Sequence, residues 1–204
     1  VGRGVPPQSA ETVSTRAFHR TIAEEPSDIP YLEGRDVGRY TVGAPTRFLR
    51  YGPWVAEHHP LERYTGPRIV VREVLAPLPH RVRACLLVAP MLYNRSVLHI
   101  VSRGADVTAL RALLCVLNSA VASRYLQLVG RKARRKLFPK LLKDDLAKFP
   151  IPRYFDRYTP ELARMGTLLS EAPGNESLER EAEILVASAF GIPEAGDVYS
   201  AIPA

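Results

Sequence analysis

Residues 110–152 constrain this chain more than any other stretch, because they join a helical apolar pattern directly to a dense run of positive charge. The stretch reads LRALLCVLNSAVASRYLQLVGRKARRKLFPKLLKDDLAKFPIP. Apolar residues recur at the three- and four-residue spacing of one helix face over about 107–129, which predicts a buried amphipathic helix. Residues 131–143 then contain seven Lys and Arg and no acidic residue. A solvated charged face usually mixes both signs, so this run predicts an anionic partner such as the phosphate backbone.

Charge is distributed unevenly along the 204 residues, whose net charge is +7. Residues 1–150 contain 24 Lys and Arg against 12 Asp and Glu, a balance of +12, whereas residues 151–204 contain 4 against 9, a balance of −5. The basic part is therefore predicted to face an anion, and the acidic tail to pack against the basic body. Arg far outnumbers Lys, which favours bidentate contacts to phosphate or guanine and equally reflects a GC-rich genome.

The remaining chain predicts strands before the central helix and helices after it. Apolar, β-branched runs bounded by Gly or Pro predict strands over 46–51, 68–75, 83–89 and 92–102. Helical patterns follow over 159–170 and 177–190. The expected fold is α+β, with a small mixed or antiparallel sheet of about four to six strands, a central helix and C-terminal helices. We expect an irregular lead-in over 1–29, a core over 30–152 and a helical extension over 153–204 that packs on the core.

Loops between these strands carry long hydrogen-bond donors. The segment PYLEGRDVGRYT, residues 30–41, places two arginines and a tyrosine beside two glycines, and Asp36 could orient either arginine. A solvated turn with one structural ion pair is the alternative for this segment. The candidates for base or backbone contacts are Arg35, Arg39, Tyr40, Arg72, Asn94 and Arg95, and those for phosphate contacts are Arg131, Lys132, Arg134, Arg135, Lys136 and Lys140.

Patterns typical of self-contained enzymes and metal sites are absent from the sequence. It has no glycine-rich nucleotide loop, no Asn-Pro-Pro-aromatic loop, no Gly-x-Ser-x-Gly and no His-Glu-x-x-His. Cys85 and Cys115 lie in apolar segments without metal-ligand spacing to a histidine, and are predicted to be reduced core thiols. Polar residues interrupt the longest apolar stretch and no signal peptide is present, so we expect a cytoplasmic protein without a membrane span. The initial Val predicts a fragment or a processed product.

Five segments in this order resemble a known family: IPYLEGRDVGRY, GPRIVVREV, LYNRSVLHIV, LRALLCVLNSAVASRYLQ and KLFPKLLKDDLAKFPIP. Together with the tail they resemble, over about residues 30–202, the TaqI-like C-terminal specificity domain. This is the target recognition domain of adenine-specific DNA methyltransferases and of restriction-modification enzymes that fuse methylation with cleavage.

The resemblance implies double-stranded DNA as the partner, with base edges read in the major groove. It also implies a separate N-terminal methyltransferase domain, which would bind S-adenosylmethionine and flip the target adenine out of the duplex. No catalytic residue is carried over to this chain, and no cofactor or metal is expected in it. The parent protein would be a site-specific adenine methyltransferase, with or without endonuclease activity.

Two other functions are compatible with the residues. A protein-interaction subunit could dock an acidic partner through the basic run, and would then show no more affinity for a duplex than an unrelated basic protein. An RNA-binding module is disfavoured, because the tyrosines do not cluster on a pair of strands as a base-stacking platform would.

Overall fold

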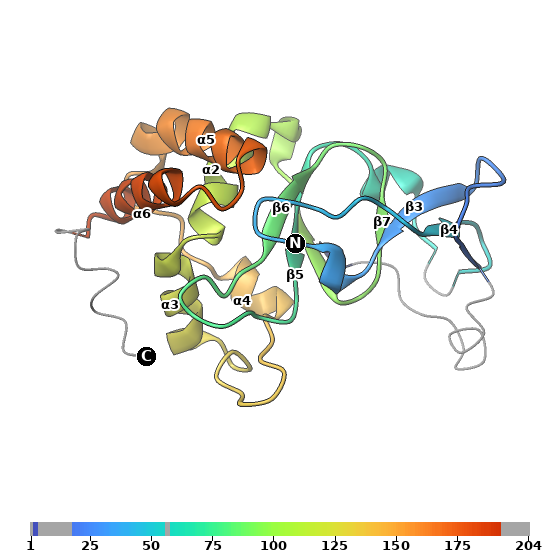
Figure 1. Ribbon diagram of the computed structural model, residues 1–204, viewed down its shortest axis with the longest axis horizontal. Coiled ribbons are helices and arrows are strands. Elements are labelled where there is room, and N and C mark those ends of the chain that lie inside the picture. Colours follow the sequence, from blue (N-terminus) through green and yellow to red (C-terminus); the bar gives the residue numbers. More distant parts are fainter. Residues whose placement is uncertain (1, 4–17, 56–57, 193–204) are drawn as a thin grey trace.

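The computed structural model describes residues 2–3, 18–55 and 58–192 and shows an elongated molecule (Figure 1). Helices occupy one end, a four-stranded sheet the middle and a second small sheet the other end. The predicted α+β class is confirmed. Most of the expected lead-in, residues 1 and 4–17, and the end of the expected helical extension, residues 193–204, lie outside the described residues.

The central sheet is built around β5, whose residues 69–71 are fully buried. Alternation along this strand sends Ile69 and Val71 into the core shared with the helices, and Val70 into a second core shared with the outer sheet. All pairings in the central sheet are antiparallel. Its strand order is β1 (Gly2–Arg3), β8 (Val97–Ile100), β5 (Arg68–Arg72) and β6 (Ala84–Leu87).

The outer sheet packs on the second core, around the buried rings of Tyr64 and Tyr93. One of its pairings, β3 with β7, is parallel. The sequence predicted one sheet, whereas the strands form two. The reason is that β3 pairs with β4 and β7 and not with the central strands. The order is β2 (His19–Arg20), β4 (Phe48–Arg50), β3 (Asp28–Leu32) and β7 (Leu92–Tyr93), and the 3-10 turns are η1 (Gly34–Asp36), η2 (Leu61–Tyr64) and η3 (Arg103–Ala105).

The predicted central helix is two helices, α2 (Val107–Leu117) and α3 (Ala120–Val129), bent by 69° at residues 118–119. Asn118 explains the break, because its side-chain amide accepts from the backbone N–H of Ala84 at 3.1 Å and donates to its carbonyl at 3.0 Å. The Ser119 hydroxyl caps the new helix. No single described helix is long and apolar enough to cross a membrane, and α2 and α3 reach that length only together, as a bent pair.

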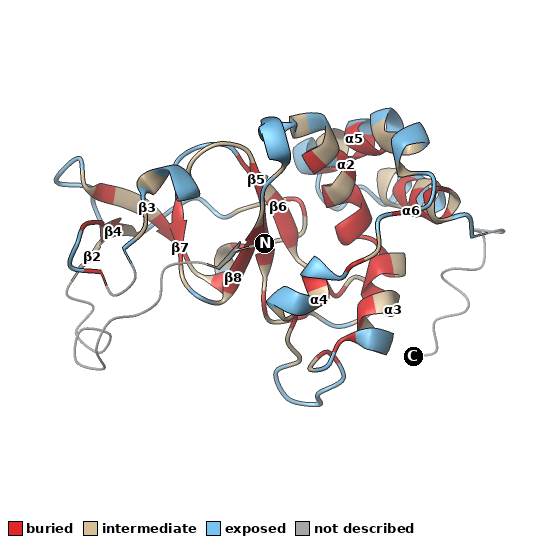
Figure 2. Ribbon diagram, turned by 180° about the vertical axis from the view of Figure 1, so that it is seen from behind, coloured by how far each residue is buried: buried red, intermediate tan, exposed pale blue. Residues whose placement is uncertain are grey.

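Three more helices complete the fold: α4 (Lys143–Ala147), α5 (Phe155–Glu171) and α6 (Glu176–Phe190). Helix α5 begins four residues before the predicted 159–170 and lies against α2, where Gly166 allows close approach to the carbonyl of Arg111. Buried residues line the sheet and the facing sides of α2 and α3 (Figure 2). Both cysteines are free and buried, as predicted, and burial raises the pKa of each thiol to about 12.

Candidate nucleic-acid interface

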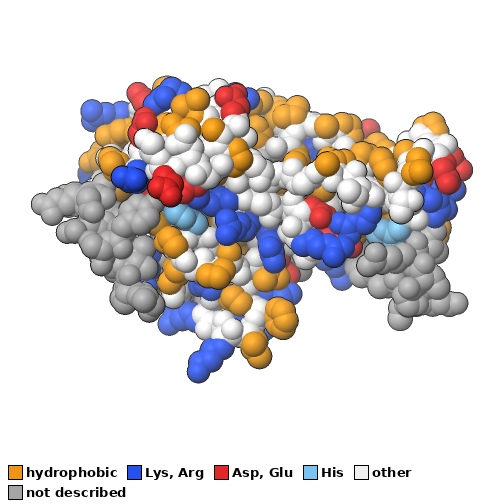
Figure 3. All heavy atoms as spheres, viewed as in Figure 1, with side chains coloured by type: hydrophobic (Ala, Val, Ile, Leu, Met, Phe, Trp, Pro, Cys, Tyr) orange, Lys and Arg blue, Asp and Glu red, His pale blue; other side chains and the backbone are white. Residues whose placement is uncertain are grey.

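The segment 131–140, called the basic arm from here on, projects from the body between α3 and α4 at the lower edge of Figure 1. Arg131, Arg134, Arg135 and Lys136 are exposed, and Lys132 is half-buried. None of the four exposed cations forms an ion pair with a carboxylate among the described residues. Lys and Arg side chains gather on this projection and across the middle of the same face (Figure 3). The arm thus holds uncompensated positive charge in contact with solvent.

Both ends of the basic arm are fixed to the body of the protein, one end at the central sheet and the other in the main core. Lys140 forms an isolated β-bridge with Val74, just beyond β5, and its ammonium contacts the Glu73 carboxylate at 3.0 Å. The carbonyl of Pro139 accepts from the Leu75 N–H at 2.9 Å. At the other end, Ala133 is completely buried. Lys140, predicted as a phosphate contact, is therefore an anchor of the arm that is paired with a carboxylate.

Arg72 lies at this same end of β5 and forms a pair of like charges with Arg83. The register pairs Val71 with Ala84, so the next residues along, Arg72 and Arg83, lie opposite each other, and the Arg72 N–H donates to the Arg83 carbonyl at 2.9 Å. Burial lowers the pKa of Arg83, and the charges of Arg39 and Arg72 lower it further. Neither guanidinium of the pair has a carboxylate within salt-bridge distance in the described part of the chain.

Like charges opposite each other on neighbouring strands are destabilising, so the pair of arginines is suited to an anion that would neutralise it. Arg83 was not predicted from the sequence. It directly precedes an apolar run, and only the register of β5 with β6 brings it against Arg72.

Two loops carrying predicted contacts meet beside this pair. The carbonyl of Ser96 accepts from the Glu73 N–H at 2.8 Å, which fixes the turn 94–96 at the end of β5. The Ser96 hydroxyl accepts from the Gly34 N–H at 3.1 Å, which brings η1 to the same place. Arg35 on η1 and Arg95 on the turn are both exposed. The structure therefore brings together three regions that are separate in the sequence.

Hydrogen bonds within these loops differ from the prediction. Asp36, expected to orient Arg35 or Arg39, instead pairs with Arg47, which the sequence did not single out. Arg47 also contacts Glu33 at 2.8 Å, and Arg35 contacts the same carboxylate at 3.0 Å. Arg47 is thus a structural residue that holds η1 in place.

Arg39 and Tyr40 are corrections to the predicted interface. Tyr40 is 4% exposed and its φ of +65° turns the ring into the main core, where burial raises the pKa of its hydroxyl. The side chain of Arg39 is 9% exposed, donates to the Asn118 carbonyl at 3.0 Å and pairs with Glu179 on α6 at 2.5 Å. Tyr40 is thus a core residue, and Arg39 is a partly neutralised link between the loop and α6.

The sequence matches the model of the TaqI-like C-terminal specificity domain over residues 29–151, which is more than half of the chain. The chain belongs to this family. The match includes the basic arm and all strands from β4 to β8, whereas α5 and α6 follow it. No curated protein matches the sequence.

A solved structure of the Type IIL restriction-modification enzyme MmeI, described as a complex with DNA, shares the fold of this specificity domain. The TM-score is 0.56 at 12% sequence identity. The likeness covers 100% of the specificity domain chain and 33% of the MmeI chain. The chain thus spans about one third of the length of that enzyme.

Predicted contacts of the specificity domain fall into two groups in the structure. Some are buried or paired with a carboxylate, namely Arg35, Arg39, Tyr40 and Lys140. The others remain accessible and lie on the basic arm or at the end of β5. The side-chain oxygen of Asn94 accepts from the Ser96 N–H. Its side-chain NH₂ has no partner among the described residues, so Asn94 belongs to the accessible group. The accessible group comprises Arg72, Asn94, Arg131, Lys132, Arg134, Arg135 and Lys136, and the side chains of Arg35 and Arg95 are exposed as well.

Proposed function

We propose that this specificity domain recognises double-stranded DNA on behalf of an N6-adenine methyltransferase of a restriction-modification system. The observation that carries the proposal is the placement of two sets of cations beside one end of β5, namely the four exposed cations of the basic arm and the Arg72–Arg83 pair. Neither set has a carboxylate partner among the described residues. Membership of the family and the DNA complex of the MmeI enzyme support the same partner. The methyltransferase domain, with its S-adenosylmethionine, would occupy a separate part of the parent protein.

The basic arm and the end of β5 would have different roles in DNA binding. The arm carries Arg and Lys side chains exposed to solvent, which suit phosphates whatever the sequence. The end of β5 combines half-buried Arg72 and Arg83 with Asn94 and Arg95 on short, hydrogen-bonded turns. Arginine can bind guanine and asparagine can bind adenine through paired hydrogen bonds in the major groove. Base recognition is therefore assigned to the end of β5 and affinity mainly to the arm.

A salt series with the 204-residue chain tests the proposal. We expect the affinity for a random-sequence duplex to fall by about 10²- to 10³-fold between 50 and 200 mM salt, because each phosphate contact releases counterions with a slope of about −0.9. Polyglutamate serves as the competing acidic partner. Salt-insensitive duplex binding, or equal displacement of the protein by polyglutamate and by DNA, would contradict DNA recognition and favour docking to an acidic protein.

Arg83 provides a test in which stability and affinity should move in opposite directions. Arg83→Met removes the like-charge repulsion with Arg72, so the free energy of unfolding should rise by about 0.5 kcal/mol. Duplex affinity should fall about tenfold, because one anion contact is lost. Chemical denaturation and fluorescence anisotropy measure the two quantities. Arg103→Met, at the opposite end of the central sheet, should change neither, and a drop in both quantities for Arg83→Met would show a structural role instead.

A further inference from the structure

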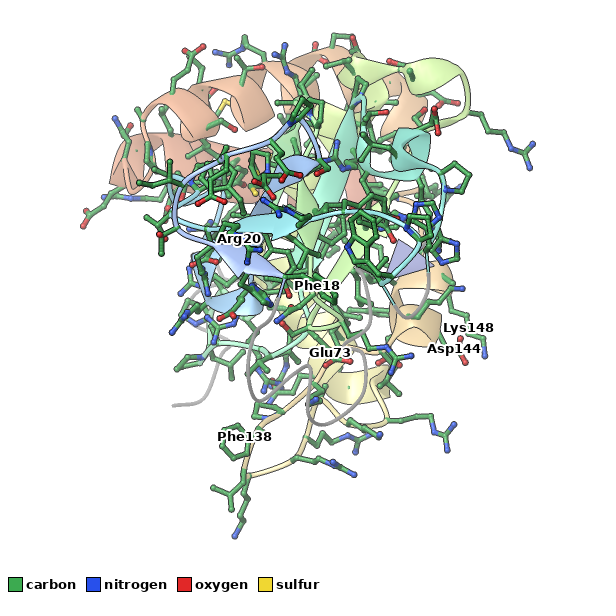
Figure 4. All side chains as sticks on the ribbon, turned by 90° about the vertical axis from the view of Figure 1, so that its right-hand side faces the viewer. Phe18, Arg20, Glu73, Phe138, Asp144 and Lys148 are labelled. Carbon is green, nitrogen blue, oxygen red and sulfur yellow. The ribbon has the colours of Figure 1, made fainter. Side chains whose placement is uncertain are left out.

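The tip of the basic arm carries two large apolar side chains that nothing covers. Leu137 is 79% exposed and Phe138 is 71% exposed. Figure 4 shows Phe138 at the far end of the arm, away from Glu73 and from the body of the protein. Single apolar residues on a surface are common. Two adjacent ones at the end of a charged projection are unusual, because water contacts both without any compensating packing.

The backbone holds this tip in an uncommon conformation. Phe138 has a φ of +50°, in the left-handed region that bulky residues rarely occupy. The two residues that follow Phe138 are fixed by backbone hydrogen bonds, which explains how this conformation persists. The Pro139 carbonyl accepts from the Leu75 N–H, and the Lys140 N–H donates to the Lys132 carbonyl at 3.1 Å. A strained residue that its surroundings hold in place is more common at functional sites than elsewhere. The two apolar side chains are therefore presented from a fixed base rather than from a free loop.

Charge around the tip identifies the partner. Arg134, Arg135 and Lys136 directly precede the two apolar residues and are exposed, and no acidic residue occurs in 131–143. The buried centre of a protein interface is depleted of charged residues, whereas three cations of one sign directly adjoin these two apolar residues, so the tip matches a phosphate backbone better than a protein surface. By contrast, proteins that deform DNA place phenylalanine or leucine between base steps while basic side chains hold the flanking phosphates.

We propose that Leu137 and Phe138 form a wedge that inserts between neighbouring bases of the bound duplex, while the three preceding cations hold the phosphates on either side. This inference rests on the proposed function, since it requires a bound duplex. A wedge must unstack a base step, and this costs least where pairing is already lost. The wedge therefore predicts a preference for damaged or unpaired sites that a purely electrostatic arm would not show.

The test compares two duplexes of the same random sequence, one fully paired and one with a single abasic site. We expect the wild-type chain to bind the abasic duplex about tenfold more tightly, because the aromatic ring can fill the gap and stack there without first unstacking two neighbouring bases. Phe138→Ala should reduce this preference to less than about twofold while leaving the slope of affinity against salt unchanged, because no charge is removed. Thermal unfolding should be the same for both proteins, since the ring is exposed.

Two control variants separate the wedge from the arm's charge. Ile184→Ala removes a side chain that is 53% exposed on α6 and should keep the tenfold preference. Arg135→Ala should weaken binding to both duplexes equally and reduce the salt slope by about one. Equal preference in wild type and Phe138→Ala, with salt-dependent binding intact, would overturn the wedge and leave the proposed function standing. Absence of salt-dependent duplex binding by the wild type would overturn both.

Discussion

Replacing the four exposed cations of the basic arm by alanine is expected to lower duplex affinity by about 10³-fold at about 0.1 M salt. The residues are Arg131, Arg134, Arg135 and Lys136. Each is exposed and lacks a carboxylate partner among the described residues, so each is free to displace a counterion from a phosphate. The slope of log affinity against log salt should become shallower by about 3 to 4 for the same reason. Fluorescence anisotropy across a salt series measures both quantities on one protein.

The matched control removes four arginines from the helical end of the molecule. Arg153, Arg157, Arg164 and Arg180 are exposed on or next to α5 and α6, and replacing them by alanine changes the net charge by the same amount. Two of them already face carboxylates, Arg164 with Glu181 and Arg180 with Glu176. We expect less than about a threefold loss of affinity, because long-range charge is screened within about 10 Å at this salt concentration. Equal losses in both variants would mean that net charge, and not the arm, determines binding.

The basic arm could be predicted from the sequence because its evidence is local. Uninterrupted positive charge needs no tertiary information, and neither does the apolar period of the helix before it. The α+β class and the family followed from the order of such local segments. The apolar period continues across residues 118–119, so the sequence predicted one helix where the structure has two.

The features that sequence could not supply all depend on partners far away in the chain. The division into two sheets depends on the pairing of β3 with β4 and β7. Apolar alternation along a strand shows which face is buried, but not which strand it pairs with. Arg39 was predicted as a DNA contact that Asp36 could orient, yet it pairs with Glu179, which is 140 residues later. Tyr40 was predicted from its chemistry as a contact, whereas its backbone conformation buries it. Arg83 was identified as part of the candidate site only from the register of β5 with β6.

Replacing Glu183 by alanine is expected to lower the free energy of unfolding by about 3 kcal/mol, the largest loss we predict for a single residue outside the apolar core. Glu183 lies on α6, is 2% exposed, and accepts from the Ala120 N–H through both carboxylate oxygens at 2.8 and 3.0 Å. It also contacts the Nε2 atom of His80 at 2.9 Å. Alanine would leave a buried N–H at the start of α3 and a histidine without its carboxylate. Urea denaturation measures the change.

Two further variants identify which property of Glu183 matters. Glu183→Gln keeps one oxygen that can accept from the Ala120 N–H, and loses the second acceptor oxygen and the charge near the helix N-terminus, so it should cost about 1 kcal/mol. Glu181→Ala, two residues away on α6, removes an exposed carboxylate paired with exposed Arg164 and should cost less than about 0.5 kcal/mol. If Glu183→Ala proved no worse than Glu181→Ala, the contact would not stabilise the fold. If Glu183→Ala costs the most, Glu183→Gln less and Glu181→Ala least, α6 is an integral part of the specificity domain, although it follows the residues matched by the family. The reason is that the Glu183 carboxylate contacts both the start of α3 and His80, on the loop that leads to Arg83.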